Sequence, residues 1–566
     1  MKYKGNPVSP GIAVGEVYRY TVFSPDIKAK TISLGEAEVA LHQYLDIKEK
    51  AKRELLAIKE KYPDKADIFA AHIEMLSDIA MNEEIQERIT EGLLSPEWAI
   101  QKTYDKFIRL LSKVKDPVMQ ERVADLQDIR RRLYRIWFGV KETNLSDLSH
   151  FKRPVVIVAH DLFPSDTATL DRPNVAAIVT EIGGSTSHSA IIARSYEIPA
   201  VLGVADIMAN LKDDETIIVD ALEGILLTRP TEEDQRVYSK KRKEYLVYAK
   251  DLKKFQGVEP VTKDGVRIDI HLNIGSAAPE ELEGSKYTDG VGLFRTEFMY
   301  MSGTHLPSEE EQFKEYRKAA LEFGERPLIL RTLDIGGDKQ LESMELPKED
   351  NPFLGLRALR LCFANLPLFK TQLRAALRAA CYGNLWIMLP MVGSIDDIRN
   401  AKAIIEEVKN ELKQENIQYN DDVKIGIMIE IPAIALMAEV AAQEVDFASI
   451  GTNDLCQYLT AVDRLNPSVS SYYQSYHPAM FRIIGQVVSA FNTAGKPIGV
   501  CGEMGGDPHA AAILIGLGMR KLSMGISAVA GIKKLITGLT ISQAEELAKK
   551  AVSLSTAEEV ENLKKN

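Results

Sequence analysis

A histidine lies among glycine and hydroxyl residues in the segment 183–200, which reads GGSTSHSAIIARSYEIPA. Gly183 and Gly184 permit a tight turn and a close approach of a ligand to the backbone. We expect a helix to begin beside His188, where unpaired backbone N–H groups would attract an anion such as phosphate. A neutral imidazole is a competent nucleophile near neutral pH and can accept and pass on a phosphoryl group. The other interpretation is an ordinary strand-to-helix turn whose histidine has no chemical role.

A second group of polar residues lies near the ends of apolar segments in the region 256–566. An arginine inside such a segment is costly to bury unless it pairs with an acid or binds an anion, and its guanidinium fits phosphate and carboxylate. Carboxylates beside a phosphate site suit Mg²⁺, and a thiol there could donate a proton to an enolate. A layer of structural ion pairs is the alternative. The residues are Asn273, Arg295, Arg331, Arg357, Glu430, Asn453, Asp454, Arg464 and Cys501.

The elements that would bring this second group together are those of a (β/α)₈ barrel. Eight strand-like segments alternate with helix-like ones, and the C-terminal ends of barrel strands converge on one face. We therefore predict a barrel over residues 256–566, with the arginines, carboxylates and thiol at its mouth. The predicted strands are 266–274, 290–298, 327–335, 353–359, 385–392, 424–432, 447–455 and 497–504.

The first half of the chain predicts an α/β domain that is interrupted by helices. Residues 1–25 contain one strand, and residues 145–230 contain five more together with the helix after the glycine pair. Between them, residues 26–144 carry four long segments of helical period, which predict an inserted four-helix bundle. A charged helix over 231–255 would connect this half to the barrel.

The second predicted helix of the insert combines an apolar patch with acidic residues. His72 lies near Glu74 and Asp78 on this helix. An apolar patch with an acidic rim could bind a basic partner, but an amphipathic helix that faces its own bundle gives the same pattern.

The composition excludes several classes of protein. The net charge of −11 disfavours nucleic-acid binding and is compatible with a basic protein partner. The four cysteines form no CxxC pair, which disfavours a zinc site or a disulfide framework and suits a reducing compartment. The N-terminus lacks an apolar signal core and no run of about 18 apolar residues occurs, so we expect a cytoplasmic protein without membrane insertion.

Six motifs together resemble the phosphoenolpyruvate-protein phosphotransferases, the enzyme I family of the bacterial sugar phosphotransferase system. The resemblance covers nearly the whole chain, from the N-terminal SPGIAVGEV to the last predicted barrel strand. The motifs are GGSTSHSAIIARSYEIPAV, NPFLGLRALR, LDIGGDK, IGIMIEIPAI, IGTNDLCQYLTAVDR and GVCGEMGGDP.

The resemblance implies a role for each candidate residue. His188 would be phosphorylated, and Cys501 would protonate the enolate of pyruvate. Phosphoenolpyruvate would be bound by Arg295, Arg331, Asn453, Asp454 and Arg464, and Mg²⁺ by Glu430 and Asp454. The helical insert, with His72, Glu74 and Asp78, would bind the phosphocarrier protein HPr. The family also implies a homodimer formed through the barrel, and a phosphohistidine domain that swivels between barrel and carrier.

The chain departs from the family pattern at three positions. Ser185 stands where the family often has Arg, Phe163 where it often has Thr, and Gly525 where a second Ser is common. The first two changes lie near His188 and could alter the lifetime of the phosphohistidine or the choice of partner.

Two rival readings share part of this pattern. Phosphoenolpyruvate synthases and pyruvate phosphate dikinases have the swivelling histidine and the barrel, but they need an ATP-binding domain ahead of the histidine. Too few residues precede His188 for one, and these contain no glycine-rich nucleotide loop. A non-catalytic regulatory paralogue would have lost the candidate catalytic residues, all of which are present.

Overall fold

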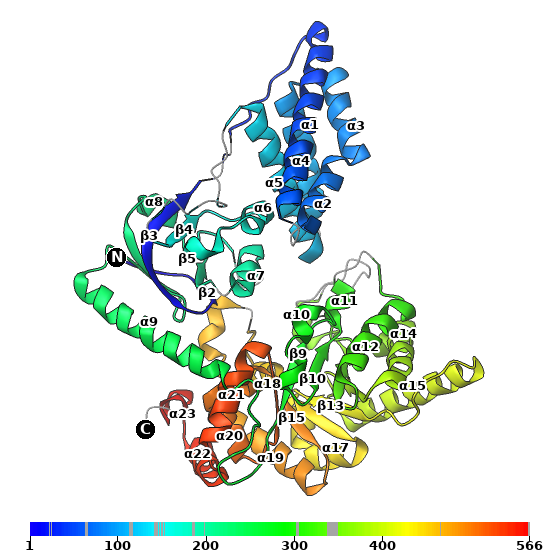
Figure 1. The fold of residues 1–566 in the computed structure, drawn as a ribbon. Coiled ribbons are helices and arrows are strands. Elements are labelled where there is room, and N and C mark those ends of the chain that lie inside the picture. Colours follow the sequence, from blue (N-terminus) through cyan, green and yellow to red (C-terminus); the bar gives the residue numbers. More distant parts are fainter. Residues whose placement is uncertain are drawn as a thin grey trace. The chain divides into compact units, whose positions relative to one another are not determined.

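The computed structural model forms two compact units, Met1–Ala249 and Lys250–Asn566, which we describe one at a time (Figure 1). It describes the chain except residues 22, 24, 63–65, 113–116, 141–144, 146, 147, 149, 150, 152, 184–186, 197, 302–304, 337–348, 465 and 564–566. The side chains of residues 67, 112, 117–121, 188, 191, 195, 280, 467 and 470 also lie outside the description. No helix among the described residues is long and apolar enough to cross a membrane.

The first unit contains an eight-stranded mixed sheet. The strands are β1 (Lys2–Lys4), β2 (Asn6–Ser9), β3 (Ile12–Tyr20), β4 (Val155–Ala159), β5 (Val175–Thr180), β6 (Ala200–Leu202), β7 (Thr216–Asp220) and β8 (Ile225–Thr228). Their order is β1-β8-β7-β3-β4-β5-β6-β2. Strand β3 is parallel to β4 and antiparallel to β7, so the predicted N-terminal strand joins a sheet that is completed much later in the chain, as expected. The sequence prediction of a single strand in residues 1–25 was incomplete, because β1 and β2 also lie there. The short helices α6 (Pro164–Ala168), α7 (His188–Ser195) and α8 (Ile207–Asn210) accompany the sheet.

The insert between β3 and β4 is helical. Its α-helices are α1 (Ala37–Lys61), α2 (Ala66–Leu76), α3 (Ile79–Thr90), α4 (Pro96–Ser112) and α5 (Pro117–Trp137). The sequence predicts one helix over 66–93, but the structure has two there, α2 and α3. Asp78 leaves the helical conformation and accepts a hydrogen bond from the Met81 backbone as the cap of α3, which explains the break.

A buried polar network connects helix α5 of the insert to α6 of the sheet domain. Asp128 accepts hydrogen bonds from the Ser165 backbone and hydroxyl at 3.0 and 2.9 Å. Arg131 donates two hydrogen bonds to Asp166, at 2.7 and 2.9 Å, and its guanidinium lies 5.0 Å from the ring centre of Phe163. Because buried charges are stable only when they are paired, these contacts fix the insert on the loop that follows β4.

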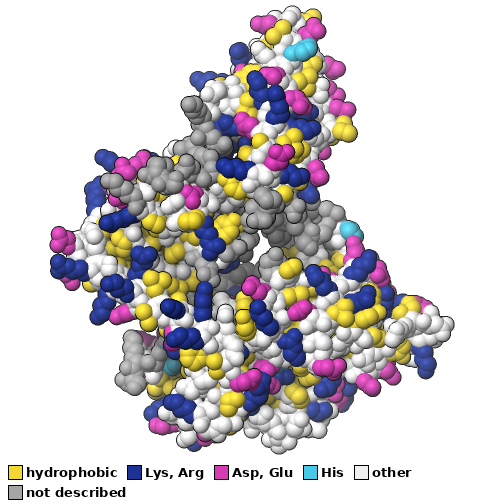
Figure 2. Space-filling model, viewed as in Figure 1, with side chains coloured by type: hydrophobic (Ala, Val, Ile, Leu, Met, Phe, Trp, Pro, Cys, Tyr) yellow, Lys and Arg dark blue, Asp and Glu magenta, His cyan; other side chains and the backbone are white. Residues whose placement is uncertain are grey.

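Helix α9 (Glu232–Lys253) follows the sheet domain, within the predicted connector 231–255. The structure describes all of its side chains, and none is buried. Figure 2 shows acidic and basic side chains interspersed over the face of the molecule in view.

The second unit is built on a closed barrel of eight parallel strands. The strands are β9 (Asp269–Ile274), β10 (Val291–Arg295), β11 (Leu328–Arg331), β12 (Leu385–Leu389), β13 (Ile425–Ile429), β14 (Phe447–Ile450), β15 (Ile498–Val500) and β16 (Lys521–Met524). Strand β16 pairs with both β15 and β9 and so closes the barrel. Helices surround it (Figure 1). They are α10 (Pro279–Leu282), α11 (Glu297–Met301), α12 (Glu309–Phe323), α13 (Leu359–Ala364), α14 (Leu366–Ala379), α15 (Ile395–Gln414), α16 (Pro432–Leu436), α17 (Ala438–Glu444), α18 (Thr452–Leu459), α19 (Pro478–Thr493), α20 (Pro508–Gly516), α21 (Ile526–Gly538), α22 (Ile541–Ser553) and α23 (Ala557–Asn562).

One predicted barrel strand is wrong. The segment 353–359 forms no strand; it runs from a 3₁₀ turn to the start of α13. Ala358 has φ of +52°, a conformation incompatible with a regular strand, and Arg357 is buried among acids. The eighth strand is instead β16, which the sequence prediction missed.

Candidate functional site

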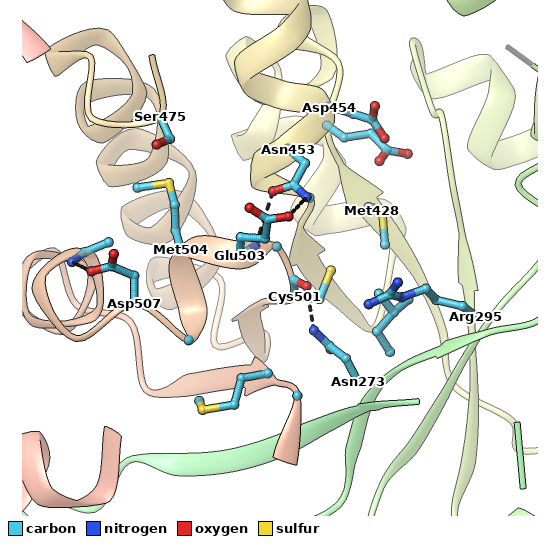
Figure 3. A pocket seen from close by; sticks show the side chains of 18 of the residues that line it. Asn273, Arg295, Met428, Asn453, Asp454, Ser475, Cys501, Glu503, Met504 and Asp507 are labelled. Carbon is cyan, nitrogen blue, oxygen red and sulfur yellow. Dashed lines mark hydrogen bonds between the residues drawn. The ribbon is translucent and has the colours of Figure 1, made fainter. Parts of the chain in front are cut away.

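A cavity of about 710 Å³ opens at the C-terminal ends of the barrel strands. Of the residues predicted for the barrel mouth, Arg357 does not line the cavity, whereas the following do: Arg295, Arg331, Glu430, Asn453, Asp454, Arg464 and Cys501. Asn273, Glu297, Asp334, Tyr473, Glu503 and Gly525 also contribute to its wall. Figure 3 shows the guanidinium of Arg295 pointing toward the space where Cys501 lies. The strand ends therefore bring residues more than 200 positions apart in sequence into one wall.

Two acids hold the buried guanidinium of Arg331. Its Nη2 donates to Glu297 Oε1 at 2.5 Å and its Nη1 lies 2.8 Å from Asp334 Oδ2. Arg331 Nε is buried without a hydrogen-bond partner among the described residues. A buried donor without a partner is costly, and an anion in the cavity would offset part of the cost of burying this arginine.

Arg357 lies behind the cavity wall and takes part in an ion-pair network. Its guanidinium donates to both oxygens of Asp334, at 3.0 and 3.3 Å, and to both oxygens of Asp454, at 3.4 and 3.0 Å. Tyr458 accepts a further hydrogen bond from Arg357 at 3.2 Å. The ion-pair layer that the sequence left open as an alternative therefore exists here, around Arg357.

Arg295 differs from the two buried arginines. It is half-buried at the end of β10, and the described part of the chain shows no ion-pair or hydrogen-bond partner for its guanidinium. An arginine that faces a cavity and retains its donors is suited to bind phosphate or carboxylate from solution.

Glu430 is a buried carboxylate in the same wall. Its Oε1 accepts a hydrogen bond from the Met391 backbone at 2.6 Å. Burial raises the pKa of Glu430 to about 8, and the charges of Asp454 and Asp334 add to this rise. A cation bound between Glu430 and Asp454 would relieve this repulsion.

Two carboxylates fit the requirements of Mg²⁺ at this wall. Mg²⁺ is commonly held by one or two carboxylates and completes its octahedron with water and substrate phosphate oxygens. Glu430 and Asp454 provide that number. No cluster of three or more His, Cys, Asp or Glu side chains suited to a metal occurs in the described ranges, which disfavours an all-protein metal cage within them.

Asn453 and Cys501 are fixed by hydrogen bonds across the mouth. Asn453 Oδ1 accepts from the Glu503 backbone at 3.2 Å, and its Nδ2 donates to Glu503 Oε1 at 3.4 Å (Figure 3). Asn273 donates to the Cys501 carbonyl at 2.9 Å. Burial raises the pKa of the Cys501 thiol to about 11, so this side chain carries its proton at neutral pH.

Arg464 is the remaining predicted residue. Its Nη1 lies 3.7 Å from Asp454 Oδ1, and its side chain is 24% exposed. Asp454 is therefore shared between the buried Arg357 and the cavity-facing Arg464, which orients its carboxylate at the mouth.

The predicted histidine lies at the first position of helix α7 in the other unit. Ser187 caps this helix by accepting a hydrogen bond from the Ala190 backbone, and Gly183 has φ of +110°, which only glycine adopts readily. The structure thus confirms that a helix begins at His188. The side chain of His188 and all of Gly184, Ser185 and Thr186 lie outside the described residues.

The burial of His72 conflicts with a direct role in partner binding. His72 is 1% exposed, and its Nε2 lies 2.9 Å from Asp125 Oδ1 of helix α5. Glu74 and Asp78 are exposed, but Asp78 also caps α3. The histidine therefore belongs to the interior of the bundle, because its partner is on a neighbouring helix.

Comparison with known proteins gives matches along the whole chain. Family models match for the N-terminal domain of PEP-utilising enzymes over residues 4–122, the mobile domain over 151–224 and the PEP-binding domain over 249–541. A phosphoenolpyruvate-protein phosphotransferase of Listeria innocua is 43% identical, over 99% of this chain and 98% of its own length. The chain belongs to the phosphoenolpyruvate-protein phosphotransferase family.

A second relative has similar coverage, and a related solved structure covers less of the chain. The phosphoenolpyruvate-protein phosphotransferase of Bacillus subtilis is 42% identical over 98% of both chains. A solution structure of Enzyme I is 35% identical and covers 43% of this chain and 99% of its own, with a TM-score of 0.39. Members of this family are enzymes that transfer a phosphoryl group from phosphoenolpyruvate, and the barrel of this chain is the PEP-binding domain.

The sequence prediction missed two acids in the wall of this phosphotransferase barrel, Glu297 and Asp334. A signal for both was present, because each follows a predicted arginine by two or three residues: Arg295 precedes Glu297, and Arg331 precedes Asp334. A buried arginine requires a partner, and that requirement could have identified them.

Proposed function

We propose that the chain transfers the phosphoryl group of phosphoenolpyruvate to His188 and from there to a histidine of the carrier HPr, as the first step of sugar uptake. The observation that supports this most is the shared cavity wall of Arg295, Arg331, Glu430, Asp454 and Cys501. These side chains are suited to bind a phosphate, a carboxylate and a divalent cation, and to donate a proton to an enolate.

The barrel residues would act in the first half of the reaction. Arg295 and Arg331 would bind the phosphate and carboxylate of phosphoenolpyruvate, with Asn453 and Arg464 adding contacts. Glu430 and Asp454 would hold Mg²⁺, which when bound neutralises charge on the phosphate.

Bond changes then follow in order. A nitrogen of His188 attacks phosphorus, the bond between phosphorus and the oxygen on C2 breaks, and pyruvate leaves as its enolate. Cys501 would donate its proton to C3 of the enolate and regain one from solvent. The N–P bond is later broken by attack of the carrier's histidine, which regenerates His188.

His188 and the cavity lie in different compact units. We infer that the two must approach each other during turnover, with 231–255 as the connector. The proposed functional domains are 1–25 with 145–230 for the phosphohistidine, 26–144 for HPr binding and 256–566 for phosphoenolpyruvate binding and dimerisation.

The free thiols of the described cysteines support a cytoplasmic location.

The test is pyruvate release. Incubation with phosphoenolpyruvate and Mg²⁺ is expected to release about one pyruvate per chain, because His188 accepts one phosphoryl group, and addition of HPr should make release continuous. Arg295→Ala should slow release about a hundredfold or more, because it removes a binding group for developing charge. Arg399→Ala, which removes an exposed ion pair with Glu444, is the control. If pyruvate release continued beyond one equivalent per chain in the absence of HPr, the proposal would be contradicted.

A further inference from the structure

Asp334 contacts two buried arginines at once. It follows strand β11, is 1% exposed, and lies 2.8 Å from Arg331 Nη1. It also accepts hydrogen bonds from Arg357 Nε and Nη2, at 3.0 and 3.3 Å. A carboxylate in this position neutralises parts of two guanidinium groups and fixes their relative orientation.

The two arginines lead to different parts of the site. Arg331 lines the cavity in which the proposed substrate would bind. Arg357 does not line the cavity but continues to Asp454, with both carboxylate oxygens in contact. Asp334 therefore connects an anion-binding arginine to a proposed Mg²⁺ ligand through a continuous series of charged contacts.

We propose that Asp334 is a positioning residue that couples phosphoenolpyruvate binding at Arg331 to metal binding at Asp454, an inference that rests on the proposed function. Without the charge of Asp334, Arg331 keeps Glu297 on Nη2 but loses the carboxylate on Nη1, which retains only the weak contact with Met428 Sδ at 3.7 Å among the described residues. Arg357 then has Asp454 as its remaining carboxylate among the described contacts, and the charge of Asp454 is less available to a cation.

Asp334→Asn removes the charge and keeps the shape. Binding is measured by calorimetry in a His188→Ala background, so that no phosphoryl transfer consumes the substrate. We expect the Kd for phosphoenolpyruvate and the half-saturating Mg²⁺ concentration both to rise about tenfold or more, because a charge-assisted contact is lost on each side.

Two further variants separate positioning from general stability. Glu297→Gln weakens the contact with Arg331 Nη2, so we expect it to weaken phosphoenolpyruvate binding and to leave the half-saturating Mg²⁺ concentration unchanged. Glu309→Gln is the matched control, because Glu309 also bridges two arginines, Arg374 and Arg378, but lies outside the cavity. It should change neither constant.

Folded Asp334→Asn protein with wild-type constants for both ligands would overturn the inference, as would equal losses in Glu309→Gln. If circular dichroism shows that Asp334→Asn does not fold, Arg357→Lys takes its place. Lysine keeps the charge but cannot hold Asp334 and Asp454 bidentately, so the half-saturating Mg²⁺ concentration should still rise, and an unchanged value would overturn the inference. Absence of phosphoenolpyruvate binding in the His188→Ala chain itself would instead refute the proposed function.

Discussion

Cys501 is the residue whose protonation state decides the fate of the proposed enolate. Burial dominates its environment and raises the pKa of its thiol to about 11, while Arg331 and Arg295 oppose the rise. The thiol is therefore an acid that keeps its proton at neutral pH and can release it to a strongly basic carbanion. Its place in the cavity wall supports this use.

Replacement of Cys501 by serine tests this assignment. A hydroxyl is a much weaker acid than a thiol, so pyruvate formation is expected to fall by about 10²–10⁴-fold, the usual contribution of a positioned acid. Rapid-quench measurement of pyruvate with Cys501→Ser and with Cys381→Ser, a half-buried cysteine outside the cavity wall, checks this. A similar rate in both variants would show that another group supplies the proton.

The sequence predicted the arginines and the thiol of the cavity wall better than it predicted the acids that hold those arginines in place. Arg295, Arg331 and Cys501 were recognisable because charge or thiol in an apolar strand end is unusual. Asp334 and Glu297 were missed because an acid after a strand is common at a protein surface. Both acids are buried beside long-range contacts that no local pattern specifies: Gln372 of α14 hydrogen-bonds to the Leu333 backbone and to the Thr296 hydroxyl, each next to one of the two acids.

Helix α3 carries an exposed surface that fits a basic carrier. Ile79 is 73% exposed at its first position, and Glu74, Asp78 and Glu83 are exposed close to it in sequence. An apolar residue with acids around it resembles the centre and rim of a transient interface. The surface differs from the sequence prediction, which placed His72 at the binding patch, because His72 is buried and Ile79 is accessible.

We therefore predict that Ile79→Lys weakens HPr binding about tenfold or more, because it places a charge in the apolar centre and repels a basic partner. Self-phosphorylation by phosphoenolpyruvate should be unchanged, since that half-reaction uses the barrel. Calorimetric titration with HPr is the measurement, and Val39→Lys, at another exposed site on α1 (61%), is the control. Equal affinities for the two variants would exclude this surface.

Among the elements, length and apolar content decided which strands could be predicted. Segments such as β12 and β13 are continuously apolar and were recognised from the sequence. Strand β16 was missed because KLSM contains two strongly apolar residues, and its strand conformation is set by pairing with β15 and β9. The segment 353–359 was wrongly predicted as a strand because it is apolar in sequence, but in the structure Leu354 is 64% exposed and the ring centre of Phe353 lies 5.6 Å from the Arg357 guanidinium.

For the whole molecule, an exposed apolar patch on the barrel supports the proposed homodimer. Leu436, Met437 and Val440 of α16 and α17 are 71%, 47% and 43% exposed. Monomeric proteins rarely leave such groups contiguous and open to water. A second copy of the chain would bury them.

Leu436→Asp is expected to raise the dimer dissociation constant about tenfold or more, which corresponds to about 1.4 kcal/mol of lost association free energy. Sedimentation velocity over a concentration series measures this. Leu321→Asp, on the outer helix α12 and 57% exposed, should leave the constant unchanged. A monomeric wild-type protein would refute the dimer, and an unaffected Leu436→Asp dimer would place its interface elsewhere.

Because the chain divides into two units, the proposed transfer from phosphoenolpyruvate to the carrier depends on His188. In the proposed function the cavity binds phosphoenolpyruvate, and the phosphoryl group reaches the carrier through His188, which lies in the other unit. This proposal requires the two units to approach each other during the reaction. A crosslink that holds them apart should abolish phosphorylation without unfolding either unit.

The most direct measurement is the intact mass of the chain after incubation with phosphoenolpyruvate and Mg²⁺. The account predicts one acid-labile phosphoryl group on the wild type, its loss on addition of HPr, and no phosphoryl group on His188→Ala. The same added mass on His188→Ala, or none on the wild type, would contradict the account.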